Sequence, residues 1–392
     1  MPQRVKASQQ ANPFRFGRIV SGEAFTDREA DLMVLQRELR DGQNVLVEAP
    51  RRFGKTSLIL EVKRRLEAEG IPVAYLDCML VPSRARLADR LASAYLQAFK
   101  NPAQRAEDWV VQHLRAFRVR PSLSFDDQGH TQLSFEAGSA GSPNLDALLE
   151  QLFSEPETIA KERKGRLVVI LDEFQDLMEL GPGLLRLLRA VIQQQQHVSY
   201  AFLGSRQALL RKAVHERSAP LLKIARPYPL GPLPREEFAT FLNARFADSG
   251  RPVTRTAVEA LIDFTRGHPN DTQEAAHFLW EVALLPLSAD ELVSTAIARV
   301  LDAEAAQMTV LWHDSAPAQR NLLTALVEWG GRNIYSEAYR RHANLGPATT
   351  VQRAVQTLLE RELVDLEPSG AYGIKERFFE EWIRRRIVRG EL

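Results

Sequence analysis

The sequence predicts an α/β protein built on a parallel sheet with helices on both faces. Between about residues 44 and 204, short apolar runs rich in β-branched residues alternate with segments of helical periodicity. Unbroken apolar runs of this length, separated by helices, are typical of strands buried on both faces of a parallel sheet. Strand–helix–strand units are almost always right-handed, and their helices cover the sheet. A different, largely helical pattern follows after about residue 230.

The candidate strands are four apolar runs, and the helix after the first run is the clearest helical element. The runs are Val45–Val47, Val73–Cys78, Leu167–Leu171 and Val198–Leu203. In the helix, apolar residues recur with the 3.6-residue period at Leu58, Ile59, Val62 and Leu66. A strand, an amphipathic helix and a further strand in succession are the unit that a parallel sheet requires.

One segment, near residues 119–136, departs from this alternation. Leu123–Phe125 and Leu133–Phe135 each alternate apolar and polar residues, and Asp126–Gly129 between them is rich in turn-forming residues. Such alternation around a turn predicts a β-hairpin, inserted here between helices.

The rest of the chain divides at a proline-rich segment. Four prolines within residues 227–234 predict irregular structure there, and helical periodicity then continues to about residue 310. In the tail, three helical stretches precede two short apolar pieces around a turn at 367–370, which is the outline of a winged helix. We therefore expect a flexible N-terminal arm over 1–15, an α/β domain over 16–230, a helical domain over 231–310 and a winged-helix domain over 311–392.

Composition restricts the class of protein and its surroundings. The 392 residues are 45% hydrophobic and 26% charged with a net charge of +1, which is typical of globular proteins and does not indicate nucleic acid as a partner of the whole chain. No apolar run is long enough for a transmembrane helix, and the N-terminus lacks the apolar core of a secretory signal. The single cysteine, Cys78, has no partner for a disulfide. We expect a cytoplasmic protein that contacts no membrane.

The strongest chemical motif is a phosphate-binding loop between the first candidate strand and its helix. Residues 49–56 match the pattern G-x-x-x-x-G-K-[ST] at every fixed position except the first, where Ala49 replaces glycine. In such a loop, backbone N–H groups and the helix N-terminus bind phosphate oxygens. We expect Lys55 to neutralise the β- and γ-phosphates and Thr56 to supply a hydroxyl to Mg²⁺. The candidate nucleotide-binding residues are Pro50, Arg51, Arg52, Phe53, Gly54, Lys55, Thr56 and Ser57.

The second motif is the acidic end of the strand Leu167–Leu171, which Asp172 and Glu173 follow directly. Two acids at the end of an apolar strand, beyond a phosphate loop and with another strand between, are typical of P-loop NTPases. We expect Asp172 to hold Mg²⁺ through water. Glu173 is the candidate that orients or deprotonates the water attacking the γ-phosphate.

A third, weaker motif is the end of the strand Val198–Leu203, where Gly204, Ser205 and Arg206 follow. The carboxyl ends of parallel strands form the edge at which open α/β sheets bind ligands. Ser205 is a candidate sensor of the γ-phosphate, and Arg206 is a candidate catalytic cation. The alternative is that Arg206 caps a surface turn.

Three further arginines each allow two interpretations. Arg51 and Arg52 either contact phosphate or face solvent or a partner. Arg189 is either a residue of a helix surface or an arginine finger toward a neighbouring copy in a homo-oligomer.

Taken together, these motifs resemble those of the archaeal-type ATPase family, which lies between the AAA+ initiators and the STAND signalling ATPases. The similarity extends from about Phe16 to Trp382. The segments that carry it are Phe25–Glu29, Pro50–Ser57, Leu171–Gln175, Gly204–Arg206, Gly267–Pro269 and Tyr372–Trp382. The resemblance implies a P-loop AAA+-like sheet, a helical lid over 231–310, a C-terminal winged helix, and ATP or ADP with Mg²⁺ as the bound species.

The resemblance also implies roles for residues that the general motifs do not reach. It puts Arg28 in a box beside the adenine. It puts His268 and Pro269 in the motif of the lid that approaches the base or the ribose. It makes Arg206 a reader of the γ-phosphate within the same chain.

Two functions remain open. One is a nucleotide-driven conformational switch, in which ATP and ADP favour different forms and so expose a surface to a protein partner. The other is an ATP-dependent factor that binds or remodels double-stranded DNA through Gln352, Arg353 and Gln356 on the third tail helix. The resemblance favours the first, because the winged helix of STAND proteins packs on the nucleotide domain and locks the closed state. Acids nearly balance bases in the tail, so no dominant basic field favours the second.

Overall fold

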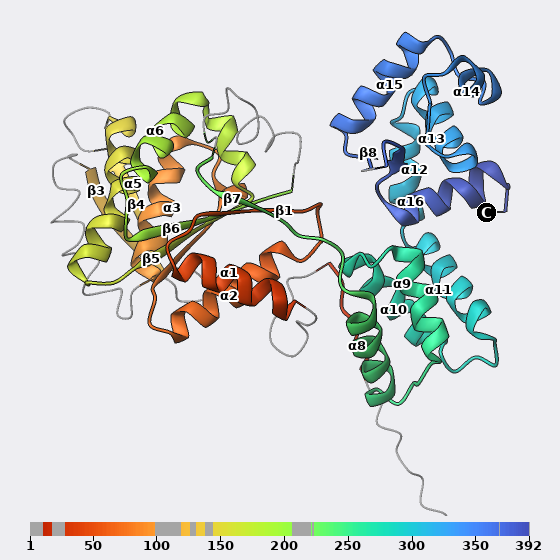
Figure 1. Ribbon diagram of the computed structural model, residues 1–392, viewed down its shortest axis with the longest axis horizontal. Helices are drawn as coiled ribbons and strands as arrows, with labels where there is room; N and C mark the ends of the chain where they lie inside the picture. Colours follow the sequence, from red (N-terminus) through yellow and green to blue (C-terminus); the bar gives the residue numbers. More distant parts are fainter. Residues whose placement is uncertain are drawn as a thin grey trace, which may run out of the picture. The chain divides into compact units, whose positions relative to one another are not determined.

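The computed structural model describes residues 11–17, 28–98, 144–205, 221, 223–367 and 369–391, and the backbone of the strands 119–125 and 131–137. The chain forms two compact units. The first, here called the sheet unit, is Ile19–Gly231, and the second, here called the helical unit, is Pro232–Leu392 with Met1–Arg18. Figure 1 labels most of the helices and strands of both units.

The sheet unit combines parallel strands with covering helices. Its strands are β1 (Val45–Glu48), β2 (Val73–Asp77), β3 (Val119–Phe125), β4 (Thr131–Ala137), β5 (Leu167–Asp172), β6 (Val198–Gly204) and β7 (Arg226–Pro229). Its α-helices are α1 (Glu29–Arg40), α2 (Lys55–Ala68), α3 (Arg84–Gln97), α5 (Leu145–Glu162) and α6 (Pro182–Ile192). Two 3₁₀ segments, η2 (Cys78–Leu80) and η4 (Phe174–Leu180), follow β2 and β5.

Five strands form one sheet in the order β2-β5-β6-β1-β7, and every neighbouring pair is parallel. Alternate residues of β1 face opposite sides: Val45 and Val47 pack in the core with α1 and α2, whereas Leu46 packs in the core with α3, α5 and α6. This alternation follows from the two-residue period of a strand. The predicted parallel sheet with helices on both faces is therefore confirmed, and Figure 1 shows α1 and α2 together on one side of it.

The prediction of irregular structure at the prolines was wrong for Arg226–Pro229, which form the edge strand β7. Pro227 and Pro229 are two residues apart, so both of their nitrogens face the open edge, where no donor is needed. The N–H groups of Arg226 and Leu230, on either side of the two prolines, face β1 and donate to the carbonyls of Asn44 and Glu48 at 2.8 Å. Prolines at every second residue are thus compatible with an edge strand.

The segment for which the sequence predicts an inserted hairpin contains the antiparallel pair β3–β4. The backbone register runs from Val119 opposite Ala137 to Phe125 opposite Thr131. The turn residues between the two strands lie outside the described residues.

The helical unit begins with a helix bundle, continues with three helices and a two-stranded wing, and ends with two short helical segments. The bundle is α8 (Arg235–Asp248), α9 (Arg255–Thr265), α10 (Pro269–Val282), α11 (Ala289–Ala303) and α12 (Ala305–His313). The remaining elements are α13 (Pro317–Trp329), α14 (Glu337–His342), α15 (Ala348–Glu360), β8 (Val364–Leu366), β9 (Tyr372–Ile374), α16 (Arg377–Trp382) and the π-helical η6 (Ile383–Val388). β8 and β9 are antiparallel, as the winged-helix prediction requires.

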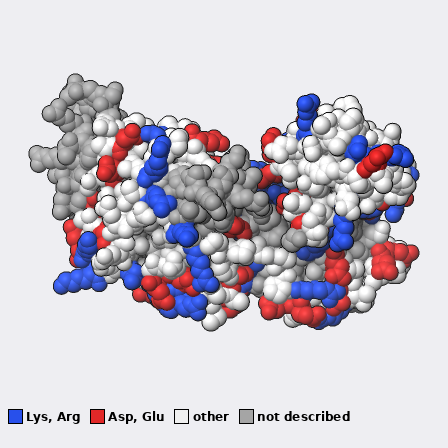
Figure 2. Space-filling model, turned by 45° about the horizontal axis from the view of Figure 1, so that its top comes forward, with Lys and Arg blue, Asp and Glu red and all other residues white. Residues whose placement is uncertain are grey.

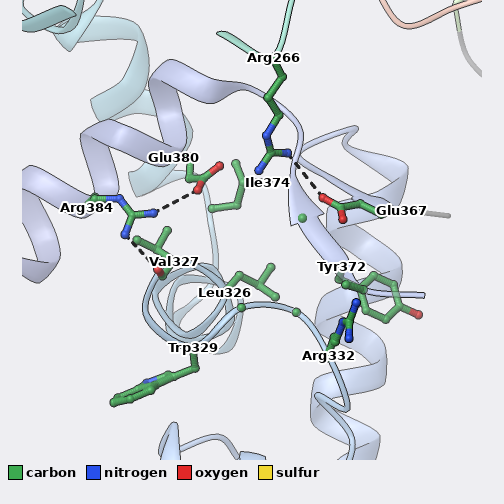
Figure 3. Close-up of a pocket in the computed structure, with 14 residues that line it drawn as sticks. Arg266, Leu326, Val327, Trp329, Arg332, Glu367, Tyr372, Ile374, Glu380 and Arg384 are labelled. Carbon is green, nitrogen blue, oxygen red and sulfur yellow. Dashed lines mark hydrogen bonds and ion pairs between the residues drawn. The ribbon is translucent and has the colours of Figure 1, made fainter. Parts of the chain in front are cut away.

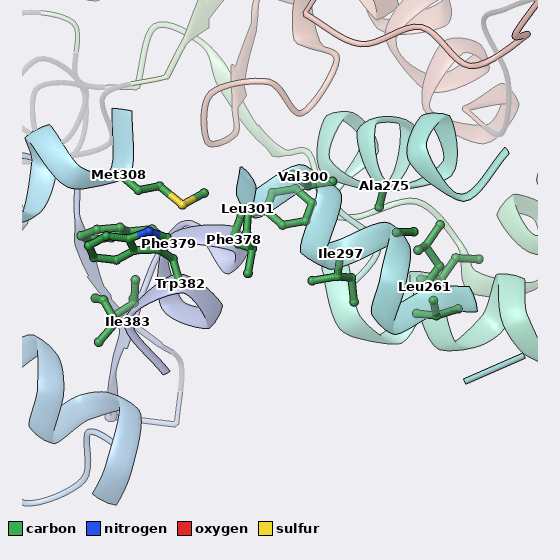
Figure 4. Close-up of a cluster of buried hydrophobic side chains, with 14 of the residues drawn as sticks. Leu261, Ala275, Ile297, Val300, Leu301, Met308, Phe378, Phe379, Trp382 and Ile383 are labelled. Carbon is green, nitrogen blue, oxygen red and sulfur yellow. The ribbon is translucent and has the colours of Figure 1, made fainter. Parts of the chain in front are cut away.

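One hydrophobic cluster runs through the bundle and the winged helix. Phe378, Phe379 and Trp382 of α16 belong to the same buried cluster as Val300 and Leu301 of α11 (Figure 4). A shared core of this kind resists separation, because moving the two parts apart would expose the apolar surface of both.

The described part of the predicted N-terminal arm packs on the helical unit. Phe14 is 1% exposed and its ring lies against that of Phe246 at a centroid distance of 4.4 Å. Asn12 donates to the His277 carbonyl at 3.1 Å, and His277 Nδ1 lies 3.0 Å from the Phe14 carbonyl. Within the described residues, no helix has the length and apolar character needed to cross a bilayer.

Candidate functional site

The candidate site lies at the carboxyl edge of the sheet, where the segments that follow β1, β5 and β6 meet. These three strands are adjacent and parallel, in the order β5-β6-β1. The phosphate loop therefore lies on the same edge as Asp172 at the end of β5 and Ser205 after β6. Ligands of open α/β sheets bind at this edge, so the topology brings the three predicted motifs together.

The phosphate loop leads into α2 through Gly54, which adopts a left-handed conformation with φ of 82°. No side chain caps the N-terminus of α2, and a Cβ added at Gly54 would meet no atom within 4 Å. The helix N-terminus is thus uncapped and has open space beside Gly54, which is the arrangement that binds phosphate. Ala49 is not among the described residues that have a positive φ. Alanine in place of the usual glycine therefore causes no backbone strain at this position.

Lys55 is buried, at 4% exposure, and its ammonium is turned onto the loop itself. Nζ donates to the carbonyl of Ala49 at 3.1 Å and to the carbonyl of Pro50 at 3.0 Å. Neutral carbonyls are weaker partners for an ammonium than phosphate oxygens are. The loop therefore holds a cation in a place where an anionic ligand would strengthen its contacts.

Thr56 and Asp172 form the link between the two strongest motifs. The Thr56 hydroxyl donates to Asp172 Oδ2 at 2.8 Å, and the Tyr75 hydroxyl donates to the same oxygen at 3.0 Å. Burial raises the pKa of the Asp172 carboxyl, which is 2% exposed, while these two hydrogen bonds act to lower it. Mg²⁺ takes hydroxyl and carboxylate oxygens, and a cation here would offset the burial of the carboxylate, so the residues fit the metal.

The Glu173 carboxylate is held by two neighbours. Its Oε2 accepts a hydrogen bond from Ser205 Oγ at 2.8 Å and another from Gln175 Nε2. The backbone of Glu173 is left-handed, with φ of 47°, and its N–H donates to Asp172 Oδ1 at 2.9 Å. The two acids at the end of β5 therefore point to different partners, which suits two different roles.

Arg28 is a buried arginine, at 6% exposure, between the phosphate loop and the end of the sheet unit. Its guanidinium donates to the carbonyls of Phe53 at 3.3 Å and Gly231 at 2.8 Å, and it pairs with Asp31 at 3.1 Å. The resemblance implied a place beside the adenine. In the structure, the side chain connects the loop to the last residue of the unit.

We expect an Arg28→Ala variant to unfold at a lower temperature, because the carbonyls of Phe53 and Gly231 and the Asp31 carboxylate lose their buried donor. A loss of about 2 kcal/mol corresponds to a melting temperature lower by roughly 4–8 °C for a unit of this size. Thermal unfolding followed by circular dichroism measures it. Arg37→Ala is the matched control, since Arg37 is an exposed arginine of the same helix and should shift melting by only about 1 °C. Equal melting temperatures for both variants would contradict a structural role for Arg28.

The other predicted residues occupy varied positions. Arg51 and Arg52 are exposed, Phe53 is partly buried and Ser57 is buried. His268 and Pro269 belong to the helical unit, where Pro269 begins α10 and His268 Nδ1 accepts from the Asp271 N–H at 3.2 Å. Arg189 is partly buried in the last turn of α6, and Arg206 lies outside the described residues.

The candidate DNA-reading residues lie on the outer side of α15. Gln352, Arg353 and Gln356 are exposed, while the opposite side of the helix is buried. Gln356 donates to Glu360 at 2.8 Å. On the face drawn in Figure 2, the basic and acidic side chains of the described residues are interspersed. Charge alone therefore does not single out a nucleic-acid surface on that face.

A cavity of about 420 Å³ lies within the helical unit, beside the wing (Figure 3). Arg266 pairs there with Glu367 at 3.5 Å, and Arg384 pairs with Glu380 at 3.1 Å. Arg384 also donates to the Val327 carbonyl at 3.2 Å. The first pair connects the end of α9 to the wing, and the contacts of Arg384 connect η6 to α16 and α13. Two of the three arginines that line the cavity are therefore paired with acids.

Sequence reasoning gave no role to two residues of the site, Tyr75 and Gln175. Tyr75 is on β2, the strand next to β5, and Gln175 follows Glu173 by two residues. The available signals were a phenolic hydroxyl within a strand and an amide two residues after Glu173. Neither signal specifies a partner, because the contacts depend on how neighbouring strands pair.

Comparison with known proteins gives matches to two family models and a similarity in fold to solved structures. The family model described as "ATPase domain predominantly from Archaea" matches residues 25–274, and a model described as "probable winged helix domain" matches residues 307–385. No curated protein matches. Among solved structures, the chain is similar to a Walker-type ATPase of Pyrococcus abyssi, with a TM-score of 0.65 and 18% identity over 95% of this chain and 99% of that chain.

Two further solved structures have lower TM-scores. The Aeropyrum pernix Orc1 protein in complex with DNA has a TM-score of 0.47 and 16% identity, over 95% of this chain and 96% of that chain. Drosophila ORC bound to DNA has a TM-score of 0.47 and 13% identity, over 98% of this chain and 95% of that chain. Because of these low scores, neither similarity supports an inference about this chain.

Proposed function

Because the chain belongs to the family of ATPase domains found predominantly in Archaea, we propose that it binds ATP with Mg²⁺ at the phosphate loop and hydrolyses it. The observation that carries the proposal is the 2.8 Å hydrogen bond between Thr56 and Asp172, since it joins the phosphate loop to the acidic strand end at one point. The family match covers residues 25–274 and so includes both motifs.

In this proposal, the loop binds the triphosphate through the Lys55 ammonium and the N-terminus of α2. Lys55 exchanges its two carbonyl partners for β- and γ-phosphate oxygens, and the N–H groups at the start of α2 donate to phosphate. Thr56 and Asp172 would hold Mg²⁺, whose charge offsets that of the phosphates. Arg28 supports the loop from behind through the Phe53 carbonyl.

Hydrolysis requires a water in line with the γ-phosphate, and Glu173 is the residue we propose to orient or deprotonate it. Ser205, which holds Glu173 at 2.8 Å, is the proposed sensor of the γ-phosphate. Arg206 is the proposed cation that offsets charge developing in the transition state. His268 and Pro269 are proposed to approach the base or the ribose from the lid.

We propose further that the nucleotide acts as a conformational switch. The boundary between the two units follows Gly231, and Arg28 binds the carbonyls of both Gly231 and Phe53 of the loop. A change in the loop on ATP binding would therefore reach the boundary through one side chain. Such a ligand shifts a population only if it binds one form more tightly than the other. The expected consequence is a surface offered to a protein partner in one nucleotide state.

A second candidate function, ATP-dependent binding or remodelling of double-stranded DNA, is favoured by one observation on α15. Gln352, Arg353 and Gln356 share its exposed side, and amides and guanidinium groups on a recognition helix can contact base edges and phosphates. In this alternative, Arg353→Ala weakens DNA binding and reduces its salt dependence.

Steady-state ATP hydrolysis by the purified chain tests both functions. We expect turnover with Mg²⁺ that disappears when EDTA removes the metal; no turnover with Mg²⁺ would contradict the proposed ATPase. Double-stranded DNA at modest salt is then added. Unchanged turnover, together with no measurable DNA affinity, supports the switch. Several-fold stimulation that is lost in Arg353→Ala favours the DNA-acting alternative.

A further inference from the structure

Gln175 uses both ends of its side-chain amide inside the candidate site. It is 2% exposed, and its Nε2 donates to Glu173 Oε2 while its Oε1 accepts from the Ser205 backbone N–H at 3.3 Å. A backbone N–H can only donate and a carboxylate can only accept, so these two partners allow one orientation of the amide. Gln175 therefore bridges the end of β5 to the end of β6.

The bridge closes a ring of three side chains, because Ser205 Oγ also donates to Glu173 Oε2 at 2.8 Å. Both hydrogen bonds to the carboxylate fall on this one oxygen. Among the described residues, Glu173 Oε1 has no hydrogen-bond partner. One oxygen of the proposed base is thus held by two donors, and no described residue holds the other.

The geometry points to Gln175 as a positioning residue, which fixes the Glu173 carboxylate so that Oε1 meets the attacking water. This inference rests on the proposed function, in which Glu173 acts on that water. Ser205 alone would leave the carboxylate free to rotate about a single hydrogen bond. A second donor on the same oxygen, itself fixed by the Ser205 N–H, removes that freedom. Misplacement of a reacting group by about 1 Å can lower a rate about a hundredfold.

Packing alone does not require a glutamine at this position. A methionine of similar volume would fill the buried space, at a cost in stability because the buried Ser205 N–H loses its acceptor. The two roles therefore predict different outcomes. A packing residue tolerates methionine in every assay, whereas a positioning residue tolerates it in folding and nucleotide binding but loses turnover.

The test compares Gln175→Met and Gln175→Glu with wild type in the full chain. We expect kcat to fall about tenfold or more in Gln175→Met, with the dissociation constant for ATP within about twofold of wild type. Gln175→Glu should be slower still, because a carboxylate in place of the amide would repel Glu173. Gln194→Met is the matched control, since Gln194 is exposed between α6 and β6 and its variant should retain wild-type turnover.

A double variant separates positioning from any independent effect. If Gln175 acts through Glu173, then Gln175→Met causes no further loss of single-turnover rate in a Glu173→Gln background. An equal loss in both backgrounds, or wild-type kcat in Gln175→Met, would overturn the inference. If Gln175→Met fails to bind ATP or to fold, Gln175→Glu serves for the same comparison.

The result distinguishes this inference from the proposed function on which it rests. Loss of turnover in Glu173→Gln with wild-type kcat in Gln175→Met rejects only the positioning role. Wild-type turnover in Glu173→Gln rejects the proposed base itself, whatever the Gln175 variants do.

Discussion

A Glu173→Gln variant is expected to keep ATP bound while its hydrolysis rate falls at least tenfold. The amide occupies the same space as the carboxylate but carries no charge and accepts a proton far less readily, so it orients the attacking water less well. The binding residues Lys55 and Thr56 are untouched. Turnover is measured under steady-state conditions, and the bound nucleotide is identified by chromatography after rapid removal of free ATP.

Glu179→Gln is the matched control, because it makes the same change at an exposed position of η4, six residues further along the chain. We expect its turnover to equal that of wild type within about twofold, since solvent and salt screen an exposed charge. If Glu173→Gln hydrolyses ATP as fast as Glu179→Gln does, another group activates the water and the proposed role of Glu173 is wrong.

Four strands of the sheet were predictable because a strand that is buried on both faces consists of an unbroken run of apolar residues. β1, β2, β5 and β6 each coincide with an apolar run, and these runs could be read locally. The order β2-β5-β6-β1-β7 could not, because it depends on which strands pair across long stretches of chain. The strand β7 was missed for a related reason: proline excludes a central strand but not an edge strand, and edge position is a tertiary property.

The phosphate loop was predictable because its sequence motif by itself specifies a turn followed by the start of a helix. The spacing of Gly54, Lys55 and Thr56 places a helix N-terminus after a tight turn, and the structure has that arrangement. The contacts of Tyr75 and Gln175 could not be predicted from the sequence, because they depend on which strands are neighbours in the sheet. Tyr75 on β2 contacts Asp172 at the end of β5, and Gln175 after β5 contacts Ser205 after β6. Arg28 is an intermediate case: its resemblance to a family box marked it as important, but only the structure shows the carbonyls that it binds.

The single hydrophobic cluster of the helical unit also could not be predicted from the sequence. Helical periodicity separates a bundle over 231–310 from a winged helix over 311–392, yet Phe378 and Trp382 are buried in one cluster with Leu301. Periodicity reports which face of a helix is apolar and not what covers it. The division into a helical domain and a winged-helix domain therefore stays a prediction from the sequence. In the structure, both ranges belong to one compact unit.

A Lys55→Ala variant is expected to lose nucleotide affinity by roughly ten- to a hundredfold. Hydrogen bonds to charged groups contribute about 1.5–3 kcal/mol, and each 1.4 kcal/mol is a factor of ten in the dissociation constant. The ammonium is buried and donates to two carbonyls of the same loop, so alanine also removes contacts that shape the loop. Titration calorimetry with ATP and with ADP measures the loss.

Lys63→Ala provides the comparison, because Lys63 is on the same helix but pairs with Glu67 at 2.6 Å, away from the loop. Its affinity for ATP should match wild type, which separates the loss of a particular cation from a loss of charge on α2. Comparing the loss of affinity for ATP with the loss for ADP identifies the phosphate that Lys55 contacts. If Lys55 contacts the γ-phosphate, ATP affinity falls more than ADP affinity, whereas equal losses would show that Lys55 acts on the β-phosphate or through the shape of the loop. Wild-type affinity for both nucleotides would contradict phosphate binding at this loop altogether.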